Sequence, residues 1–303
     1  MAVNNSLAPK QGNKPQTFSA FLSGDAVKKR IGTLVGSKDG PRFITSIVSA
    51  VSTNPALAEC EHSTILSAAL LGESLKLSPS PQLGQYYMVP FNDKKRGCKV
   101  AQFQLGYKGY IQLAIRSGYY KKLNVLAIKE GELVKFDPLE EEIEVNLVED
   151  DTLRESLPTI GYYAMFQYEN GFKKAMYWSR EKMMAHADKY SMAFNSAKYR
   201  DLIEGKIPQS EMWKYSSFWY KDFDGMAYKT MLRQLISKWG IMSIELQTAM
   251  DKDMAAINED GSANYVDNSA DYEQAGDNAP ADVIDIDPGT GEVIDDPTAD
   301  FFN

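Results

Sequence analysis

The sequence predicts an α+β fold, with a β-rich centre between two helical regions. Helical patterns occupy residues 24–76, seven short segments within 85–178 have the composition of strands, and helical patterns return from residue 180. Strands and helices that are grouped along a chain in this way, instead of alternating, are typical of α+β proteins. We therefore expect a central antiparallel or mixed β-sheet flanked by helices.

Composition divides the 303 residues into three parts. We expect a flexible arm and a first helix in 1–40, a folded core in 41–250 and a disordered acidic tail in 251–303. The chain has no run of eighteen apolar residues and its polar start lacks the apolar block of a signal peptide, so we expect no membrane span and no leader. Two cysteines are too few for a disulfide framework, which indicates a reducing cytosol.

Three helices are predicted near the start of the chain, over about 24–36, 41–53 and 62–76. In the third helix, apolar side chains such as Leu66 and Leu70 recur at helical spacing. The Ser-Pro-Ser-Pro run that follows ends this helix, because proline disfavours helical conformation in the residue before it.

Residues 85–91 (QYYMVPF) and 99–105 (KVAQFQL) predict a β-hairpin. Both segments are short and rich in aromatic and β-branched side chains, and the NDKKRGC segment between them contains typical turn residues. The cations Lys94, Lys95 and Arg96 are expected to project from the tip of this hairpin.

A GYKG stretch follows the second strand and opens a helix predicted over 107–117. Its spacing differs from the GxxxxGK[ST] pattern of a nucleotide-phosphate loop, so ATP-driven activity is not expected. Its glycines permit an unusual backbone turn and a close approach of the chain, and the helix start offers N–H donors to an anion. Lys108 and Arg116 fall on one stripe of this helix, and Lys121 and Lys122 extend the positive surface. An ordinary solvated helix face has the same pattern.

The remaining elements of the core are strands followed by helices. Strands are predicted over about 122–129, 132–137, 141–148, 159–168 and 172–178. Ser179 is a candidate N-cap for a helix over 180–189. A longer helical region is predicted over 211–239, with Gly240 ending or kinking it before a short run to about 250.

Charge is unevenly distributed along the chain. The net charge is −8, yet residues 1–250 alone carry +6, because 251–303 hold fifteen acids and one lysine. Residues 76–129 hold ten Lys and Arg against one acid, and 130–155 then hold eleven acids against two cations. This segregation indicates a polyanion-binding face and an acidic counter-face, with an uneven solvated surface as the simpler alternative.

Aromatic and basic residues are interleaved in two places. Five of the eight residues 213–220 are aromatic and have lysines beside them, and KYR at 198–200 repeats the pattern. Aromatic rings beside a cationic groove hold single-stranded nucleic acid without reading its sequence. Core packing is the alternative that we expect for most of these rings, and for a helical stripe that includes Tyr228 and Trp239.

Catalysis has little support in the sequence. The only histidines, His62 and His186, have no recognisable partner motif, and the acids within 140–151 would alternate between the two faces of a strand. Cys60 lies two residues before His62, but so few soft ligands do not predict a zinc site. We expect neither enzyme activity nor a protein metal site.

Two sequence blocks resemble the RecT family of phage and prophage single-strand annealing proteins, in particular those of Gram-positive bacteria and their phages. The first runs from TILSAALLGESLKLSPSPQLGQYYMVPF (64–91) through FQLGYKGYIQLAIRSG (103–118), and the second is WYKDFDGMAYKTMLRQLISKW (219–239). The likeness extends over about 40–250. One departure is Lys76, which stands where the family's pattern leans toward glycine.

The resemblance implies ATP-independent binding of single-stranded DNA and annealing of complementary strands in phage homologous recombination. It implies a fold distantly similar to the Rad52-type annealing fold, assembly into rings or helical filaments, and work in the cytoplasm of a bacterial host. It also implies two protein partners, a 5′→3′ exonuclease and the host single-strand-binding protein. No cofactor is implied, and Mg²⁺ would act on DNA pairing alone.

The resemblance assigns Tyr107, Lys108, Arg116, Lys229 and Arg233 to a DNA groove. The basic and aromatic patterns add further candidates for DNA binding, which are Lys94, Lys95, Arg96, Lys121, Lys122, Lys198, Tyr199, Arg200, Lys214, Trp219 and Lys221.

Two other classes of function stay open. A passive single-strand-binding protein would coat DNA and slow its pairing, and a metal-dependent nuclease would shorten labelled DNA with Mg²⁺. The acidic tail, which ends in DDPTADFFN, has three possible roles, namely competition with DNA for the groove, docking on a partner, and solubilisation.

Overall fold

The computed structural model describes residues 17–191 and 193–265. Within these residues helices flank antiparallel sheets, which confirms the α+β class. Residues 1–16 of the expected arm and 266–303 of the expected tail lie outside the described residues. No helix in the described part of the chain is long and apolar enough to cross a membrane.

The N-terminal part of the described chain is helical, as predicted. Its elements are α1 Phe18–Leu22, α2 Asp25–Leu34, α3 Gly40–Thr53, the 3-10 helix η1 Pro55–Glu59 and α4 His62–Ser74. Helix α4 is buried on all sides between Thr64 and Gly72. A helix without a polar face belongs inside a fold, and α4 packs against α3 and against the first sheet.

The first sheet has the order β1-β2-β8-β9. Its strands are β1 Tyr86–Asp93, β2 Cys98–Leu105, β8 Ala255–Ile257 and β9 Ala263–Asn264. The first two strands form the predicted hairpin. The tail was predicted to start at residue 251, which is too early. The folded chain continues past this residue, since β8 pairs with β2 and β9 pairs with β8. Strands of two or three residues are too short to show a readable period, so the sequence pattern missed them.

The second sheet has the order β3-β6-β7, and β4 and β5 form a separate hairpin. The bounds are β3 Tyr120–Lys129, β4 Leu133–Asp137, β5 Glu142–Val145, β6 Thr159–Tyr168 and β7 Lys173–Ser179. Helix α5 Tyr107–Ser117 connects the first sheet to β3, and the short helix α6 Asp151–Ser156 precedes β6. All five predicted strands are present. The alternation of apolar and polar residues did not predict that these strands divide between two sheets.

Helices make up most of the rest of the described chain. They are α7 Arg180–Tyr190, α8 Ser196–Ile203, the 3-10 helix η2 Gln209–Lys214, α9 Phe218–Lys221, α10 Phe223–Trp239 and α11 Ile244–Asp251. The helix predicted over 211–239 is therefore broken. Asp222, with φ −148°, interrupts it and caps α10 by accepting a hydrogen bond from the Gly225 N–H at 3.0 Å. Asp favours such N-cap positions because its carboxylate satisfies an otherwise unpaired helix N–H.

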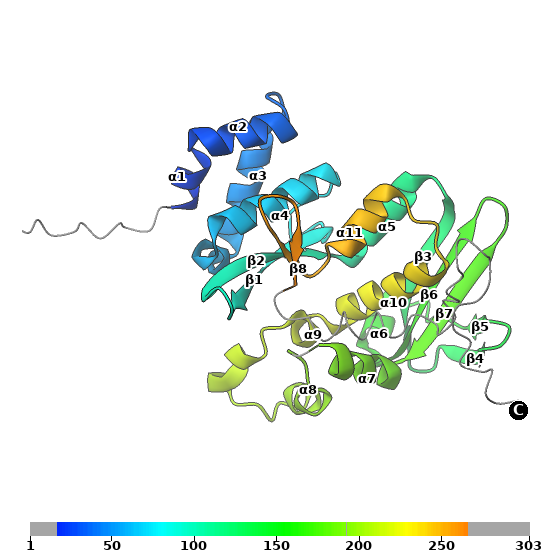
Figure 1. The fold of residues 1–303 in the computed structure, drawn as a ribbon. Coiled ribbons are helices and arrows are strands. Elements are labelled where there is room, and N and C mark those ends of the chain that lie inside the picture. Colours follow the sequence, from blue (N-terminus) through cyan, green and yellow to red (C-terminus); the bar gives the residue numbers. More distant parts are fainter. Residues whose placement is uncertain (1–16, 192, 266–303) are drawn as a thin grey trace, which may run out of the picture. The chain divides into compact units, whose positions relative to one another are not determined.

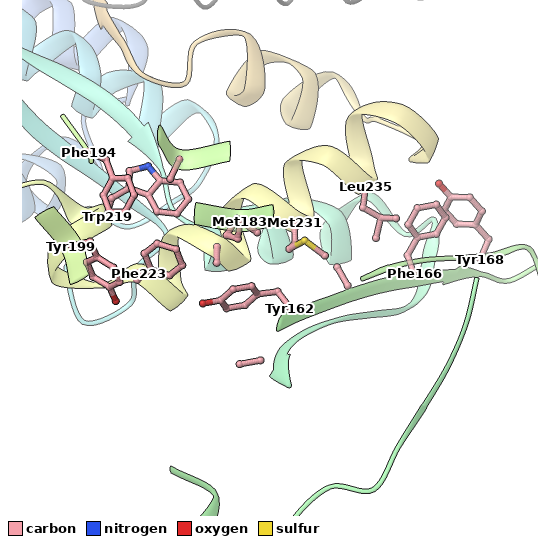
Figure 2. Packing of buried hydrophobic residues seen from close by; sticks show 14 residues of the cluster. Tyr162, Phe166, Tyr168, Met183, Phe194, Tyr199, Trp219, Phe223, Met231 and Leu235 are labelled. Atoms are coloured by element: carbon pink, nitrogen blue, oxygen red, sulfur yellow. The ribbon is translucent and has the colours of Figure 1, made fainter. Parts of the chain in front are cut away.

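Helix α10 packs on the β3-β6-β7 sheet (Figure 1). Figure 2 shows the resulting core, in which Tyr162 and Phe166 of β6 lie in one cluster with Met231 and Leu235 of α10. These four side chains are at most 1% exposed. Burial of aromatic and aliphatic area on this scale is the main favourable term in folding.

The aromatic residues of the late helical region belong to the core only in part: Trp219 and Phe223 are buried, Tyr220 and Tyr228 pack against the core, and Trp213 is 73% exposed. Tyr199 and Trp219 are 7% and 6% exposed and lie in the cluster of Figure 2. Trp239, which was expected in the buried stripe, is 45% exposed because it is the last residue of α10. The Lys174 ammonium lies 3.8 Å from the centroid of its ring.

Candidate nucleic-acid interface

The GYKG motif turns the chain from β2 into α5. Gly106 is the N-cap of α5 and has an ordinary extended backbone, with φ −82° and ψ 160°, so the unusual turn expected here is absent. A Cβ atom at Gly106 would lie 2.1 Å from the Gly84 carbonyl oxygen, and one at Gly109 would lie 2.1 Å from that of Gln85. The expected close approach is present, and both glycines are needed for it.

The loop before β1 is hydrogen-bonded to this corner. The Gly106 N–H donates to the Gln85 carbonyl at 2.9 Å, and the side-chain oxygen of Gln85 accepts from the Ser78 N–H at 2.8 Å. Gly84 has a left-handed φ of +59°, and the stem of Lys108 lies against it. The two parts of the first RecT-like block, which are separated in sequence, are therefore in direct contact.

A narrow hollow opens beside this corner. Three half-buried rings line it, and they are Tyr87 of β1, Tyr107 of α5 and Phe218 of α9. The ring centroids of Tyr87 and Phe218 are 5.3 Å apart, and Tyr107 stands edge-on to Tyr228 at 5.4 Å. Partly exposed rings at a concave surface are suited to stacking on nucleic-acid bases.

Charged groups also line the hollow, among them Asp222 and Lys229. Burial raises the pKa of Tyr87 and of Tyr107, and the nearby Asp222 carboxylate raises both pKa values further. Both phenols are therefore protonated at neutral pH and can donate a hydrogen bond.

Sequence reasoning found Tyr107 but did not select Tyr87 or Phe218. Tyr87 lies between the buried Tyr86 and Met88 in β1, so strand alternation places its ring on the opposite face. That alternation was a usable signal. The contact of Tyr87 with Phe218 could not be predicted in this way, because the two residues are 131 positions apart in the sequence.

Two of the predicted cations are exposed on elements that line the hollow. Lys108 follows Tyr107 directly, and its ammonium lies 5.9 Å from the centroid of that ring. Lys221 is the last residue of α9, one turn after Phe218. Lys214 of η2 is also exposed and forms an ion pair with Glu211 at 3.1 Å.

Lys229 and Arg233 converge on Asp253, instead of extending along an open groove. The Lys229 ammonium lies 2.9 Å and the Arg233 guanidinium 3.1 Å from the fully buried Asp253 carboxylate. The same carboxylate accepts from the Leu105 N–H at 2.8 Å. Burial lowers the pKa of Lys229, and Asp253 opposes that shift. The sequence placed Asp253 in a tail, so this ion cluster was not predicted.

Arg116 binds the end of another helix. Its guanidinium donates to the carbonyl of Leu75 at 2.7 Å and to that of Lys76 at 3.3 Å, just beyond the C-terminus of α4. A cation at a helix C-terminus satisfies unpaired carbonyls and interacts favourably with the helix dipole. Arg116 therefore has a structural role in addition to its predicted place in the groove.

Lys76 adopts a left-handed backbone conformation, with φ +52°. This is the conformation that glycine adopts most easily at the end of a helix. The Lys76 N–H donates to the Glu73 carbonyl and the Leu77 N–H to the Gly72 carbonyl, both at 2.9 Å. The family's pattern favours glycine at this turn, and this chain makes the same turn with a lysine.

The basic tip of the first hairpin lies at the opposite end of β1 from the hollow. Asp93 organises this tip by accepting from the N–H groups of Lys95 and Arg96, each at 3.0 Å. Lys94 and Lys95 are exposed as predicted, and Arg96 forms an ion pair with Glu61. The eight residues of β1 place tip and hollow roughly 25 Å apart.

The remaining predicted residues do not line the hollow. Lys121 and Lys122 are exposed at the start of β3, where Lys121 lies 3.9 Å from Glu169. Lys198 and Arg200 are exposed on α8, and Tyr199, which lies between them in the sequence, is buried. Together with the buried Trp219, Tyr199 packs in the core of Figure 2.

No metal-binding cluster was found among the described residues. In residues 17–191 and 193–265 no three His, Cys, Asp or Glu side chains lie close enough together to hold an ion. Cys60 is 3% exposed, and burial raises the pKa of its thiol to about 11. His62 packs against the rings of Phe18 and Phe21.

Comparison with known proteins places the motifs of this interface in a family. The profile described as "RecT family" matches residues 41–267. The chain is 35% identical to the "Uncharacterized protein YqaK" of Bacillus subtilis strain 168 over 305 aligned positions, covering 98% of this chain and 91% of that protein. It is 27% identical to "Protein RecT" of Escherichia coli K12 over 256 positions, covering 82% of this chain and 86% of that protein.

Proposed function

The chain belongs to the RecT family, and we propose that it binds single-stranded DNA and anneals complementary strands without ATP. Membership of this family supports a role in recombination by strand annealing. The observation that carries the proposal for this chain is the hollow at the GYKG motif. There Tyr87, Tyr107 and Phe218 present half-buried rings, and the exposed Lys108 and Lys221 lie on the same elements.

The chemistry of the hollow favours bases inside it and phosphates along its rim. Rings stack on any base, because every base has a π-face, so binding is independent of sequence. Both Asp222 and Lys229 line the hollow, so its lining carries no net positive charge that would draw phosphates inside. Lys108 and Lys221 would neutralise phosphates at the edge and release counterions, which makes the affinity dependent on salt.

Annealing then needs no chemical step by the protein. Contacts to the backbone hold the first strand, and base pairing with the second strand supplies both specificity and driving force. In this proposal the protein self-associates along the DNA, works in the bacterial cytoplasm and acts beside a 5′→3′ exonuclease and a host single-strand-binding protein.

The test is the pairing rate of two complementary fluorescent oligonucleotides at low salt, with EDTA present and nucleotide absent. The proposal expects faster pairing with the protein than without it, and no acceleration for non-complementary strands. Binding with slower pairing would instead identify a passive single-strand-binding protein. Shortening of the labelled strand that requires Mg²⁺ would identify a nuclease.

A further inference from the structure

An exposed lysine adopts the left-handed conformation at the C-terminal end of α4. Lys76 has φ +52° and is exposed, whereas its neighbours Leu75 and Leu77 are each 3% exposed. The two buried leucines hold the chain on both sides of Lys76. Residues with a Cβ atom are disfavoured in this conformation, and glycine is the residue that helices most often use there. Lys76 therefore makes the turn less stable than glycine would.

Arg116 of α5 binds the same turn. Its guanidinium donates to the carbonyls of Gln112, Leu75 and Lys76 at 3.3, 2.7 and 3.3 Å. Arg116 keeps its positive charge, but these three hydrogen bonds direct its donors to the backbone of its own protein. A phosphate at this end of α5 would therefore need a donor from a second residue.

The ammonium of Lys76 is available as that donor. In residues 17–191 and 193–265, neither Lys76 nor Lys108 forms an ion pair or a hydrogen bond through its side chain. The Lys108 ammonium lies 5.9 Å from the centroid of the Tyr107 ring. Since the Lys76 side chain makes no such contact within the described fold, the fold does not explain why a lysine stands at a position that favours glycine.

The charges around Lys76 leave this end of α5 positive. Glu245 of α11 is an acid near these cations, and hydrogen bonds at the start of α11, together with Arg116 and Lys76, lower its pKa. Glu73 in the last turn of α4 pairs with Arg42 at 3.6 Å. Glu245 offsets one of the two cations beside it and leaves the other, so an anion is still attracted to this surface.

Lys76 is connected to the hollow along the side of α5. The stem of Lys108, on an element that lines the hollow, lies against Gly84, and Arg116 binds the backbone of Lys76. Lys108 and Arg116 are eight positions apart in α5, which is about 12 Å along the helix axis. The chain after α4 therefore contacts α5 near both of its ends. A DNA strand that leaves the hollow along α5 reaches Lys76 at the far end of the helix.

We propose that the Lys76 ammonium binds a phosphate of the DNA strand whose bases enter the hollow. The inference rests on the proposed function, since it takes single-stranded DNA as the ligand of the hollow, and it adds a contact that the family resemblance does not assign. Backbone strain of this kind is concentrated at functional sites. In this chain a less stable turn is kept because its side chain contributes to binding.

Three substitutions separate the charge of Lys76 from its backbone conformation. Lys76→Gln removes the charge and keeps a Cβ atom in the left-handed turn, Lys76→Gly removes both, and Lys76→Arg keeps both. Fluorescence anisotropy of a labelled single-stranded oligonucleotide at several salt concentrations measures binding. Thermal unfolding without DNA measures stability.

The glycine variant should be more stable and yet bind DNA more weakly. Lys76→Gly should raise the midpoint of thermal unfolding by roughly 2–4 °C and lower the log–log salt slope by about one unit. Lys76→Gln should lower the slope equally without raising the midpoint. Lys76→Arg should keep both wild-type values. A purely structural role of Lys76 would raise the stability of the glycine variant and leave its DNA binding unchanged.

Two results would overturn the proposal. One is a wild-type slope in both Lys76→Gln and Lys76→Gly. The other is an equal reduction of the slope in Lys28→Gln, which would assign the effect to net charge instead of a local contact. Lys28 is the matched control because it is an exposed cation of α2 and lies outside both α5 and the turn after α4.

Failure of this inference is distinguishable from failure of the proposed function. Normal binding by the wild type, with unchanged slopes in the glutamine and glycine variants, overturns the Lys76 contact alone. Absence of oligonucleotide binding by the wild type overturns the proposed function, and the Lys76 contact with it.

Discussion

The carboxylate of Asp253 lies 2.9 Å from the ammonium of Lys229, and both residues are buried. Asp253 also accepts from the Leu105 N–H, one residue before the GYKG motif. The ion pair therefore ties the segment after α11 and helix α10 to the corner that forms the hollow. A cation that the family resemblance places in a DNA groove is held in this chain by an internal carboxylate.

Asp253→Asn should destabilise the fold by about 3–5 kcal/mol, because removing one member of a buried ion pair leaves the other charge without compensation. The free energy of unfolding in urea measures this effect. Asp201→Asn is the matched control, since Asp201 pairs with Lys198 at the surface at 3.9 Å and should cost less than about 0.5 kcal/mol. Equal effects of the two substitutions would contradict the structural role of Asp253.

Gly106→Ala and Gly109→Ala should each destabilise the protein by about 3 kcal/mol, since the new methyl groups would meet backbone carbonyls at 2.1 Å. Gly32→Ala in α2 is the control. No atom lies within 4 Å of the Cβ position there, and alanine in a helix should stabilise by up to about 1 kcal/mol. Thermal unfolding of the three variants checks the contrast, and a tolerated Gly106→Ala would argue against the close contact.

Lys76→Gly should stabilise the protein by about 1 kcal/mol, because glycine removes the cost of the left-handed conformation at φ +52°. In a chain of this size the midpoint of thermal unfolding should rise by roughly 2–4 °C. Lys76→Ala removes the same charge but keeps the strained backbone. A rise of equal size in the alanine variant would assign the gain to charge and contradict the backbone explanation.

Lys108→Ala should lower the salt dependence of single-stranded DNA binding by about one unit of log–log slope, without loss of stability. Arg116→Ala should in addition destabilise the fold by about 1–3 kcal/mol, because it leaves the carbonyls of Leu75 and Lys76 without a donor. Fluorescence anisotropy at several salt concentrations, with urea unfolding alongside, separates the two effects. Lys38→Ala, an exposed cation before α3, should change neither quantity, and an unaltered slope for Lys108→Ala would exclude its contact with phosphate.

His186 should make the fold less stable in mild acid. Burial, together with the nearby cations Lys189, Arg233 and Lys182, lowers its pKa from 6.5 to about 4. Between these values the unfolded chain binds a proton that the folded chain does not, so this contribution to stability is present above pH 6.5 and is lost toward pH 4. It amounts to about 2 kcal/mol after allowance for partial exposure.

The unfolding free energy of wild type and His186→Gln, measured at pH 7.5 and pH 4.5, tests this prediction. The loss of stability on acidification should be smaller in the variant. Parallel losses in the two proteins would show that other groups cause the acid sensitivity.

Local signals predicted much of the fold. The hairpin of β1 and β2 and the helix α5 occur within a residue or two of the expected bounds, since alternation, turn residues and helical spacing are read from consecutive residues. The late helix was predicted to begin at residue 211, whereas α10 begins at Phe223, because Asp222 was not recognised as an N-cap. The short strands β8 and β9 offered no period to read.

The candidate site was predictable in part. Tyr107 and Lys108 were selected from the sequence and lie at the hollow or on its edge. Tyr199 and Trp219 have the same composition pattern but are buried. Packing between elements decides whether a ring is buried or exposed, and composition alone does not predict it.

The sequence by itself determined the family, the α+β class and the place of the GYKG corner between a strand and a helix. Each of these depends on residue types within a short stretch of chain. The tertiary structure alone decided that Lys229 binds Asp253 and that Tyr87 meets Phe218. Leu105 and Asp253 are 148 residues apart in the sequence, and a contact over that separation exists only once the chain has folded.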